Sequence, residues 1–552
     1  MTTTQQTDQA AAPPTAEGDQ LQYDLVVVGA GFAGMYMLHR ARTAGFSVHV
    51  YEAGSGVGGT WYWNRYPGAR CDVESLEYSY SFSKELRDEW EWPERYSGQP
   101  DIERYANHVA DRFDLRRDIQ FETRVTSAVF DEAQHVWAIA TSAGDRVRAR
   151  YLIMATGCLS AVNLPNIPGR DSFVRESYHT GQWPKEPVSF AGKRVAVIGT
   201  GSSGVQSVPV IASRAASLTV FQRTPSYSLP SANGPIPVDE VQQFRANFEA
   251  IHAANLKMPG GTGSRFTAAV QGSVLQVPIE RRSDVFGKAW TAGGFSFMRS
   301  FSDIATSHEA NGVAAGFVKE KIRELVRDQE TAELLCPEIP IGCKRMIIDS
   351  GYYETFNMSH VTLCDARIEP IEAITATGVR TVKGDYEFDM IVFATGFDAM
   401  VGSLTRIDIQ GRAGLQLRDA WEAGPRTYLG LAVTDFPNLF TITGPGSPSV
   451  LTNMMVSIEQ HVDWITNCLE YVRERGASTI EPTLAAQEAW VDHVNDVATR
   501  DIMHTAPSCD SWYLGSNIPG KPRVFMPLPG LPAYIERCNQ VAAAGYEGFV
   551  LA

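Results

Sequence analysis

Three features are scarce or missing in this chain of 552 residues, and each absence excludes a class of protein. Its eight cysteines are scattered without a Cys-x-x-Cys pair, which excludes the usual relay of paired thiols and offers no zinc site. No apolar run approaches the ~20 residues that a transmembrane helix requires. No basic tract offsets the net charge of −15, which argues against nucleic acid or an anionic membrane as a partner.

The remaining composition, 44% hydrophobic and 20% charged, is that of a globular protein. The length allows two or three domains with large cores. Residues 1–20 are polar and rich in Ala, Pro, Thr and Gln, which predicts a disordered tail without the apolar stretch of a signal peptide. The scattered cysteines favour a reduced, cytoplasmic setting.

Two glycine-rich turns are the most informative feature of the chain. Each follows an apolar run that reads as a buried parallel strand, at 25–28 and at 195–198, and each opens a helical stretch. In such a turn the first glycine permits the bend, the second lets the backbone approach a pyrophosphate, and the third lets helix and strand pack closely. Two copies predict two dinucleotide sites. The turns are Gly29-Ala30-Gly31-Phe32-Ala33-Gly34 and Gly199-Thr200-Gly201-Ser202-Ser203-Gly204.

The residue expected beside the ribose differs between the two sites. Glu52 ends the strand expected at 48–51, and a carboxylate there accepts both hydrogen bonds of a free ribose diol, as in FAD or NAD. The same count from the second turn gives Gln222, followed by Arg223 and Thr224. An uncharged amide beside a guanidinium suits a 2′-phosphate, so the second site is predicted to prefer NADPH.

A near-repeat of an apolar strand ending in Ala-Thr-Gly, at 151–157 and 390–396, indicates how the two units are joined. We expect the chain to cross to the second unit after the first copy and to return after the second. The sequence therefore predicts an α/β protein with two Rossmann-like domains, the NADP domain being inserted in the FAD domain. The expected ranges are 21–157 for the first segment of the FAD domain, 158–394 for the NADP domain with a helical insert at about 235–340, and 395–552 for the second segment of the FAD domain with the C-terminal region.

Helices are predicted from apolar spacing at three places. Segments 239–258 and 312–327 belong to the insert, with a glycine-rich turn at 259–263 between them. A third helix is expected at 454–475, with Gly476 as its stop.

The segment from Gly58 to Asp72 combines small residues with Trp61, Tyr62 and Trp63, which can wall a flat ring system. Each aromatic residue taken singly reads equally well as part of a core loop, and Asp72 alone reads as a turn or cap residue. The order of the whole segment fits the pattern [A/G]-G-x-W-x(4)-[F/Y]-P-[G/M]-x(3)-D. By this pattern the chain resembles the type I Baeyer–Villiger monooxygenases.

A second segment is similar to the family fingerprint F-x-G-x(3)-H-x(3)-W-[P/D], with Phe173, His179, Trp183 and Pro184 in place. Arg175 stands where the family has glycine. If that glycine requires a positive φ, the arginine is strained. Trp183 favours the Baeyer–Villiger group over heteroatom-oxygenating flavin monooxygenases, whereas His179 alone reads more simply as a structural hydrogen-bonding residue.

A third segment runs from Gly342 to Tyr353 and contains Lys344 and Arg345. A Lys-Arg pair before an apolar pair usually marks a solvated strand end. The resemblance instead implies that Arg345 is the catalytic arginine, oriented by Asp72, and that Lys344 lies near the NADP 2′-phosphate. The likeness covers 21–552 and looks closest to the phenylacetone and steroid monooxygenase branch, although 293–297 is similar to the cyclohexanone branch.

The resemblance implies an FAD-containing, NADPH- and O₂-dependent enzyme that converts ketones to esters or lactones. A flavin C4a-peroxide would attack the ketone, and Arg345 would stabilise the peroxide and the tetrahedral adduct. The implied partners are a small ketone and O₂, without nucleic acid or membrane, in a monomer or weak homo-oligomer. The implied cofactor-binding set is Gly29, Gly31, Ala33, Gly34, Glu52, Gly59, Thr60, Trp61, Trp63, Arg70, Cys71, Asp72, Tyr78, Val125, Gly199, Thr200, Gly201, Ser202, Ser203, Gly204, Gln206, Arg223, Thr224, Lys344, Arg345, Met454 and Trp512.

Two other functions stay open at this point. An N- or S-oxygenating flavin monooxygenase would share both turns, and Trp183 with Arg345 argues against it. A catalytically silent NADP-sensing protein would show degraded flavin or catalytic motifs, whereas both are intact. A reductase acting on disulfides is disfavoured because no cysteine pair is available.

Overall fold

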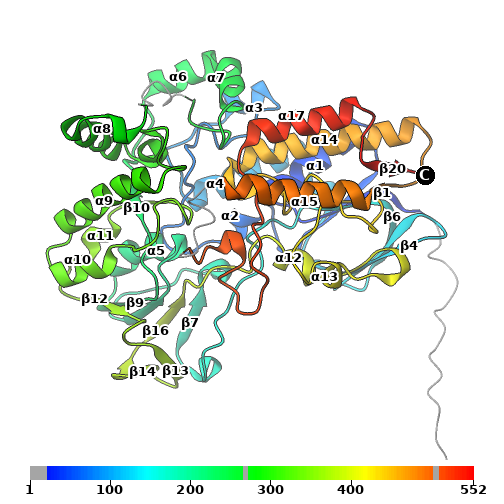
Figure 1. Ribbon diagram of the computed structural model, residues 1–552. Helices are drawn as coiled ribbons and strands as arrows, with labels where there is room; N and C mark the ends of the chain where they lie inside the picture. The colour runs from blue at the N-terminus through cyan, green and yellow to red at the C-terminus, as the bar shows by residue number, and fades with distance from the viewer. Residues whose placement is uncertain (1–20, 265–271, 501–508) are drawn as a thin grey trace, which may run out of the picture.

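The computed structural model describes residues 21–264, 272–500 and 509–552, and it contains two mainly parallel sheets, each with its own helices (Figure 1). The tail expected at 1–20 lies outside the described residues. The first sheet has the order β17-β4-β5-β6-β1-β2-β3, with β18 paired to β6. Its strands are β1 (Tyr23–Val28), β2 (Val48–Tyr51), β3 (Ile119–Gln120), β4 (Val125–Asp131), β5 (Val136–Thr141), β6 (Arg146–Met154), β17 (Asp408–Gln410) and β18 (Leu439–Thr441).

The second sheet has the order β12-β9-β8-β16-β7, and its neighbouring strands all run parallel. Its core strand β8 is flanked by β9 and β16, and Val195, Val197 and Met390 are fully buried there. The strands are β7 (Glu176–His179), β8 (Arg194–Ile198), β9 (Ser217–Gln222), β12 (Val361–Asp365) and β16 (Met390–Phe393). The antiparallel strands β13 (Ile371–Thr375), β14 (Gly378–Thr381) and β15 (Gly384–Glu387) form a separate small sheet.

The chain leaves the first sheet after β6, builds the second sheet from β7 to β16, and rejoins the first sheet at β17. The α/β architecture with two Rossmann-like units expected from the two turns is therefore present. The boundaries assigned to 157 and 394 stay predictions.

The helical region of the second unit lies between β10 (Ser228–Pro230) and β11 (Ile347–Asp349), which pair with each other. The helix expected at 239–258 is divided at Asn247, because two shorter helices meet there. The helix expected from 312 begins earlier, since Ser307 caps it by accepting from the Ala310 amide. The helices are α6 (Val238–Ala246), α7 (Phe248–Asn255), α8 (Ile279–Ala292), α9 (His308–Leu325) and α10 (Gln329–Leu335).

Helices that are far apart in the sequence cover the first sheet together. In Figure 1, α14 (Met454–Glu474) runs beside α1 (Phe32–Thr43), and α17 (Leu531–Ala543) packs on α14. The helix expected at 454–475 is confirmed, and its apolar side, which includes Ile458 and Val462, is buried. Within the described ranges no helix has the length and apolarity to cross a bilayer.

Shorter elements complete the molecule and join its larger units. The helices are α2 (Thr60–Trp63), α3 (Lys84–Glu89), α4 (Gln99–Arg112), α5 (Ser202–Ala212), α11 (Tyr352–Thr355), α12 (Gly402–Thr405), α13 (Leu417–Ala420) and α15 (Leu484–Thr499), and β19 (Ile480–Pro482) pairs with β20 (Phe549–Leu551).

Candidate functional site

The first glycine turn lies between β1 and α1, at the carboxyl edge of the parallel strands. Gly29 has a φ of 105°, and a Cβ there would lie 2.6 Å from the Ala155 carbonyl oxygen, so no other residue fits. A Cβ on Gly31 would lie 3.3 Å from the Cα of Gly59. The turn and the 58–63 segment therefore approach each other backbone to backbone, which suits the cradle of a pyrophosphate.

Glu52 lies at the end of β2 and is 5% exposed. Its two carboxylate oxygens accept from the backbone amides of Ala30 and Gly54, each at 2.7 Å. Burial raises the pKa of Glu52, and the hydrogen bonds from Ala30 and Gly54 oppose that rise. Each oxygen keeps a lone pair that can accept a ribose hydroxyl, so the chemistry of this position fits an adenosine ribose.

The aromatic segment is only partly gathered at the site. Trp61 Nε1 donates to the Tyr78 hydroxyl at 3.0 Å, and both rings are buried. Trp63 is instead 37% exposed and packs edge-on against Tyr62. Of the three aromatic residues expected to wall a flat ring system, Trp61 and Tyr62 are buried, and Trp63 lies at the surface.

Arg345 and Asp72 form the polar centre between the two units. The guanidinium Nε lies 2.5 Å from Asp72 Oδ2, and Nη2 lies 2.9 Å from Oδ1. Arg345 Nη1 also donates to the Val450 carbonyl. Burial opposes the positive charge, but the Asp72 carboxylate outweighs this effect and holds the pKa of Arg345 above its usual value. The result is a permanently charged group fixed on three donors.

The C-terminal segment reaches the same centre. Tyr513 is 2% exposed and hydrogen-bonds to Arg345, and burial raises the pKa of Tyr513 to about 12. Trp512 lies beside it, with the two ring centroids 4.3 Å apart. On the opposite side Phe295 of the helical insert faces Arg345, its ring centroid 6.0 Å from Cζ. A cavity adjoining Asp72 is lined from this insert by Phe295, Ser296 and Arg299.

Two of the scattered cysteines are paired, which the search for a Cys-x-x-Cys pair did not find. Cys343 and Cys509 form a disulfide with their Cα atoms 6.1 Å apart, and the other six cysteines are free and buried. The spacing rule failed because it tests for pairs close in sequence, whereas 166 residues separate these two.

The second glycine turn has the same geometry as the first. Gly199 has a φ of 109°, and α5 begins directly after it at Ser202. Thr200 Oγ1 donates to the Thr224 carbonyl at 3.0 Å, so the turn is tied to the chain that follows β9. A Cβ built on Gly201 meets no atom within 4 Å, which leaves space in front of the helix N-terminus.

Beside this turn lie two cations, the exposed Arg223 and the half-buried Lys344. Gln222 is 1% exposed and its Nε2 donates to the Leu334 carbonyl at 2.7 Å, and its place at the ribose stays a prediction. Arg223 is exposed and lies close to Lys344. Burial and the charge of Arg223 lower the pKa of Lys344, while Asp510 opposes them. Neither cation has an ion-pair partner within 4 Å among the described residues, and this suits a phosphate dianion.

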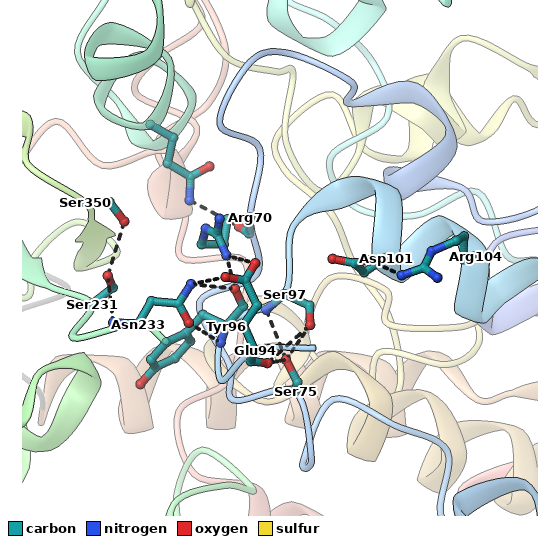
Figure 2. Close-up of polar contacts among 11 residues, drawn as sticks. Arg70, Ser75, Glu94, Tyr96, Ser97, Asp101, Arg104, Ser231, Asn233 and Ser350 are labelled. Atoms are coloured by element: carbon teal, nitrogen blue, oxygen red, sulfur yellow. Dashed lines mark hydrogen bonds and ion pairs between the residues drawn. The ribbon is translucent and has the colours of Figure 1, made fainter. Parts of the chain in front are cut away.

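Arg70 was expected at the cofactor, but its side chain serves a polar network, as Figure 2 shows. It donates to the Glu94 carboxylate and to the Tyr96 carbonyl. Asn233 joins this network, donating to Glu94 at 2.7 Å and accepting from the Tyr96 amide at 2.8 Å. The Arg70 carbonyl accepts from Gln206 of α5 at 3.1 Å. Asn233 and Gln206 therefore link the 70–97 segment to the second unit.

The fingerprint segment forms β7 and the turn after it. His179 is buried, accepts from the Gly181 amide at 3.0 Å and lies 3.3 Å from Thr395 Oγ1. Burial lowers the pKa of His179 to about 4, so the ring is neutral and structural. Arg175 does not adopt a positive φ, so the strain expected there is wrong. Its guanidinium instead pairs with Asp389 at 2.5 Å and donates to the Phe388 carbonyl.

The remaining expected residues lie around the first turn and at the start of α14. Thr60 begins α2, Cys71 is buried directly before Asp72, and Val125 is buried in β4. Met454 is the first residue of α14, whose cap Asn453 accepts from the Met455 amide. Sequence reasoning missed the Val450 carbonyl and Tyr513 as partners of Arg345. A backbone acceptor and a distant tyrosine leave no sequence signal.

A family model described as pyridine nucleotide-disulphide oxidoreductase matches residues 23–236, less than half of the chain. Curated relatives match almost all of it. The phenazine N-monooxygenase of Lysobacter antibioticus is 42% identical over 543 residues, covering 97% of this chain and 98% of that protein. A Baeyer–Villiger monooxygenase of Pseudooceanicola batsensis is 41% identical over 533 residues, covering 96% of each. Among solved structures, an oxidized steroid monooxygenase bound to NADP is 49% identical with a TM-score of 0.89, covering 96% of this chain and 99% of that one.

Proposed function

The chain belongs to the Baeyer–Villiger monooxygenase family. We propose that its ketone substrate reacts beside the guanidinium of Arg345, which Asp72 holds in place. It is an FAD- and NADPH-dependent flavoprotein monooxygenase that converts ketones to esters or lactones. The observation that carries the assignment of the site is the two-point contact of Arg345 with Asp72, at the meeting of the two units.

The residues present fit both cofactors. FAD would be held by the first turn, by Glu52 at its ribose and by the Trp61 wall. NADP would be held by the second turn, with Arg223 and Lys344 at the 2′-phosphate. Bound FAD, once reduced by NADPH, supplies the activation of O₂.

Arg345 supplies a fixed positive charge for oxygen that becomes anionic during the reaction. Its protonation does not change, because Asp72 holds its pKa above the usual value. Its direction does not change, because Asp72 and the Val450 carbonyl occupy three of its donors. Such a charge needs no reorganisation as the oxyanion develops. Tyr513 of the C-terminal segment and Phe295 of the helical insert contact Arg345 and leave its side chain 24% exposed.

A second candidate is N-oxygenation, which is favoured by the 42% identical phenazine N-monooxygenase. NADPH oxidation should be followed with phenylacetone, cyclohexanone, a large cyclic ketone, a steroid ketone, a sulfide and an aromatic N-heterocycle, with every product identified. Ester or lactone from a ketone supports the proposal. N-oxide or sulfoxide alone, with no product from any ketone, transfers the assignment to heteroatom oxygenation.

We place the enzyme in the cytoplasm as a monomer or weak homo-oligomer. The support for the cytoplasm is cysteine usage, because six of the eight cysteines are free. The net charge of −15 supports a partner set limited to small molecules. Sedimentation of the FAD-loaded protein over a concentration series tests the oligomeric state.

A further inference from the structure

One covalent link ties the arginine segment to the C-terminal segment. The disulfide joins Cys343, which is fully buried, to Cys509, which is 2% exposed, and Ile339 packs against both. All eight cysteines lie within the described residues, and only these two are bonded. We propose that this pair is a reversible thiol–disulfide site that responds to hydrogen peroxide and fixes residues 509–515 against Arg345.

The position of the link carries the proposal. Cys343 lies two residues before Arg345, and Cys509 lies four residues before Tyr513. Tyr513 itself hydrogen-bonds to Arg345, so the same two segments are joined once by a covalent bond and once through the guanidinium. The Ser511 amide donates to the Cys509 carbonyl, and the Ser511 side chain caps the short helix Trp512–Leu514. Moving Cys509 therefore moves Trp512 and Tyr513 with it.

The chemistry balances with a reagent that the enzyme itself produces. When NADPH oxidation is not followed by oxygen transfer, O₂ takes up two electrons and two protons and leaves as H₂O₂. A thiol of the pair gives up its proton, its sulfur attacks one peroxide oxygen as the O–O bond breaks, and the departing hydroxide takes that proton to leave a sulfenic acid and one water. The partner thiol then attacks that sulfur, forming the S–S bond and releasing the second water.

The disulfide then lowers the release of the peroxide that formed it. With the bond formed, Tyr513 and Trp512 stay against Arg345, water is excluded more completely, and less NADPH is spent on peroxide. With the bond reduced, the segment is held only by non-covalent contacts and opens more often. This role rests on the proposed function, because that function supplies the peroxide. A small dithiol restores the thiols by thiol–disulfide exchange with the Cys343–Cys509 bond.

The first test counts thiols and needs no ketone. The disulfide of FAD-loaded wild type should be fully reduced with a dithiol, and the reductant should then be removed. The protein should next be treated with H₂O₂, denatured and alkylated, and its cysteines mapped by mass spectrometry. We expect a cross-linked pair of peptides containing Cys343 and Cys509, with the other six cysteines alkylated. Eight alkylated cysteines after peroxide treatment, or a cross-link between other cysteines, would overturn the proposal.

The second test measures the rate of peroxide release per enzyme in the absence of ketone, so its failure is separate from failure of the ketone reaction. Reduced wild type should release peroxide several-fold faster than oxidised wild type. Cys509→Ser should match the reduced form under both conditions, while the control Cys364→Ser, a buried free cysteine in β12, should respond like wild type. Equal leakage from oxidised and reduced wild type would overturn the role even if the bond forms.

Discussion

At the scale of single residues, the site depends on charges whose partners are fixed before any ligand binds. Arg345 has three donors occupied by protein acceptors, whereas Arg223 and Lys344 have no ion-pair partner among the residues that the structure describes. The first arrangement keeps a charge in place through a reaction, and the second leaves charges available for a ligand.

Removing the guanidinium of Arg345 should abolish oxygen transfer and spare the fold. A preorganised charge at a developing oxyanion is worth ~2.7–4 kcal/mol, or about 10²–10³ in rate. Arg345→Ala should bind FAD and still consume NADPH, but should yield hydrogen peroxide instead of ester. Asp72→Ala should show a related loss with slower flavin reduction. The measurement is ester formed per NADPH oxidised, and a normal yield from Arg345→Ala would remove this residue from the mechanism.

Removing Arg223 should weaken NADPH selectively. A hydrogen bond to a charged group contributes about 1.5–3 kcal/mol, so Arg223→Ala should raise the KM for NADPH and leave the KM for NADH nearly unchanged. Steady-state kinetics with both coenzymes provide the check. An equal loss with NADH would show that Arg223 does not contact the 2′-phosphate.

At the scale of elements, sequence periodicity was reliable where an element carries its own signal. The strands before both glycine turns, the turns themselves and α14 were predicted, because tight bends and buried faces restrict which residues can occupy them. The division of α6 from α7 at Asn247 and the direction of Gln222 were not. Gln222 turns towards a carbonyl 112 residues away, and local spacing contains no information about such a partner.

Strand β7 offers a test of the departure from the fingerprint at Arg175. Its pair with Asp389 is more than one-third exposed on the arginine side, so it contributes only ~0.2–1 kcal/mol. Arg175→Gly should therefore lower the thermal midpoint slightly and keep activity. Asp389→Asn should cost more, because Asp389 also pairs with Arg194 at 3.1 Å. A rise in the midpoint of Arg175→Gly would show that the pair with Asp389 does not stabilise the folded state.

Helix α14 carries a buried carboxylate that should make stability depend on pH. Glu459 accepts from the Ser81 amide and hydroxyl at 2.6 and 2.7 Å, and burial raises its pKa to about 7 against those hydrogen bonds. The folded state thus binds this proton more tightly than the unfolded state. Its contribution is fully present below the ordinary pKa of 4.5 and is lost as the pH rises through 7.

Glu459→Gln should flatten this dependence. Thermal unfolding between pH 5 and pH 8 should show a smaller loss of stability at the alkaline end than in wild type. Glu470→Gln, a change at a half-buried position of the same helix that pairs with Arg473, should leave the wild-type profile nearly unchanged. An unaltered profile in Glu459→Gln would place the titration on another group.

At the scale of the whole molecule, the disulfide closes a loop of 166 residues that runs from the arginine segment to the C-terminal segment. The chain-entropy model gives about 5 kcal/mol of stabilisation for a loop of this size. Reduction should therefore lower the free energy of unfolding of wild type. Chemical denaturation with and without reductant provides the measurement, and Cys509→Ser should be insensitive to reductant. Equal stability of the oxidised and reduced wild type would contradict this expectation.

The nesting of one sheet inside the other also sets an order of assembly on the ribosome. The strands of the second sheet lie between Glu176 and Phe393, so this sheet has all its strands as soon as β16 has emerged. The first sheet still lacks β17 and β18 at that moment, so the part of β6 that pairs with β18 is without its partner. We therefore expect the second sheet to be completed before the first. A translational pause once β16 has emerged would give the second sheet time to fold, and in either order the edge of β6 stays unpaired until β18 is made.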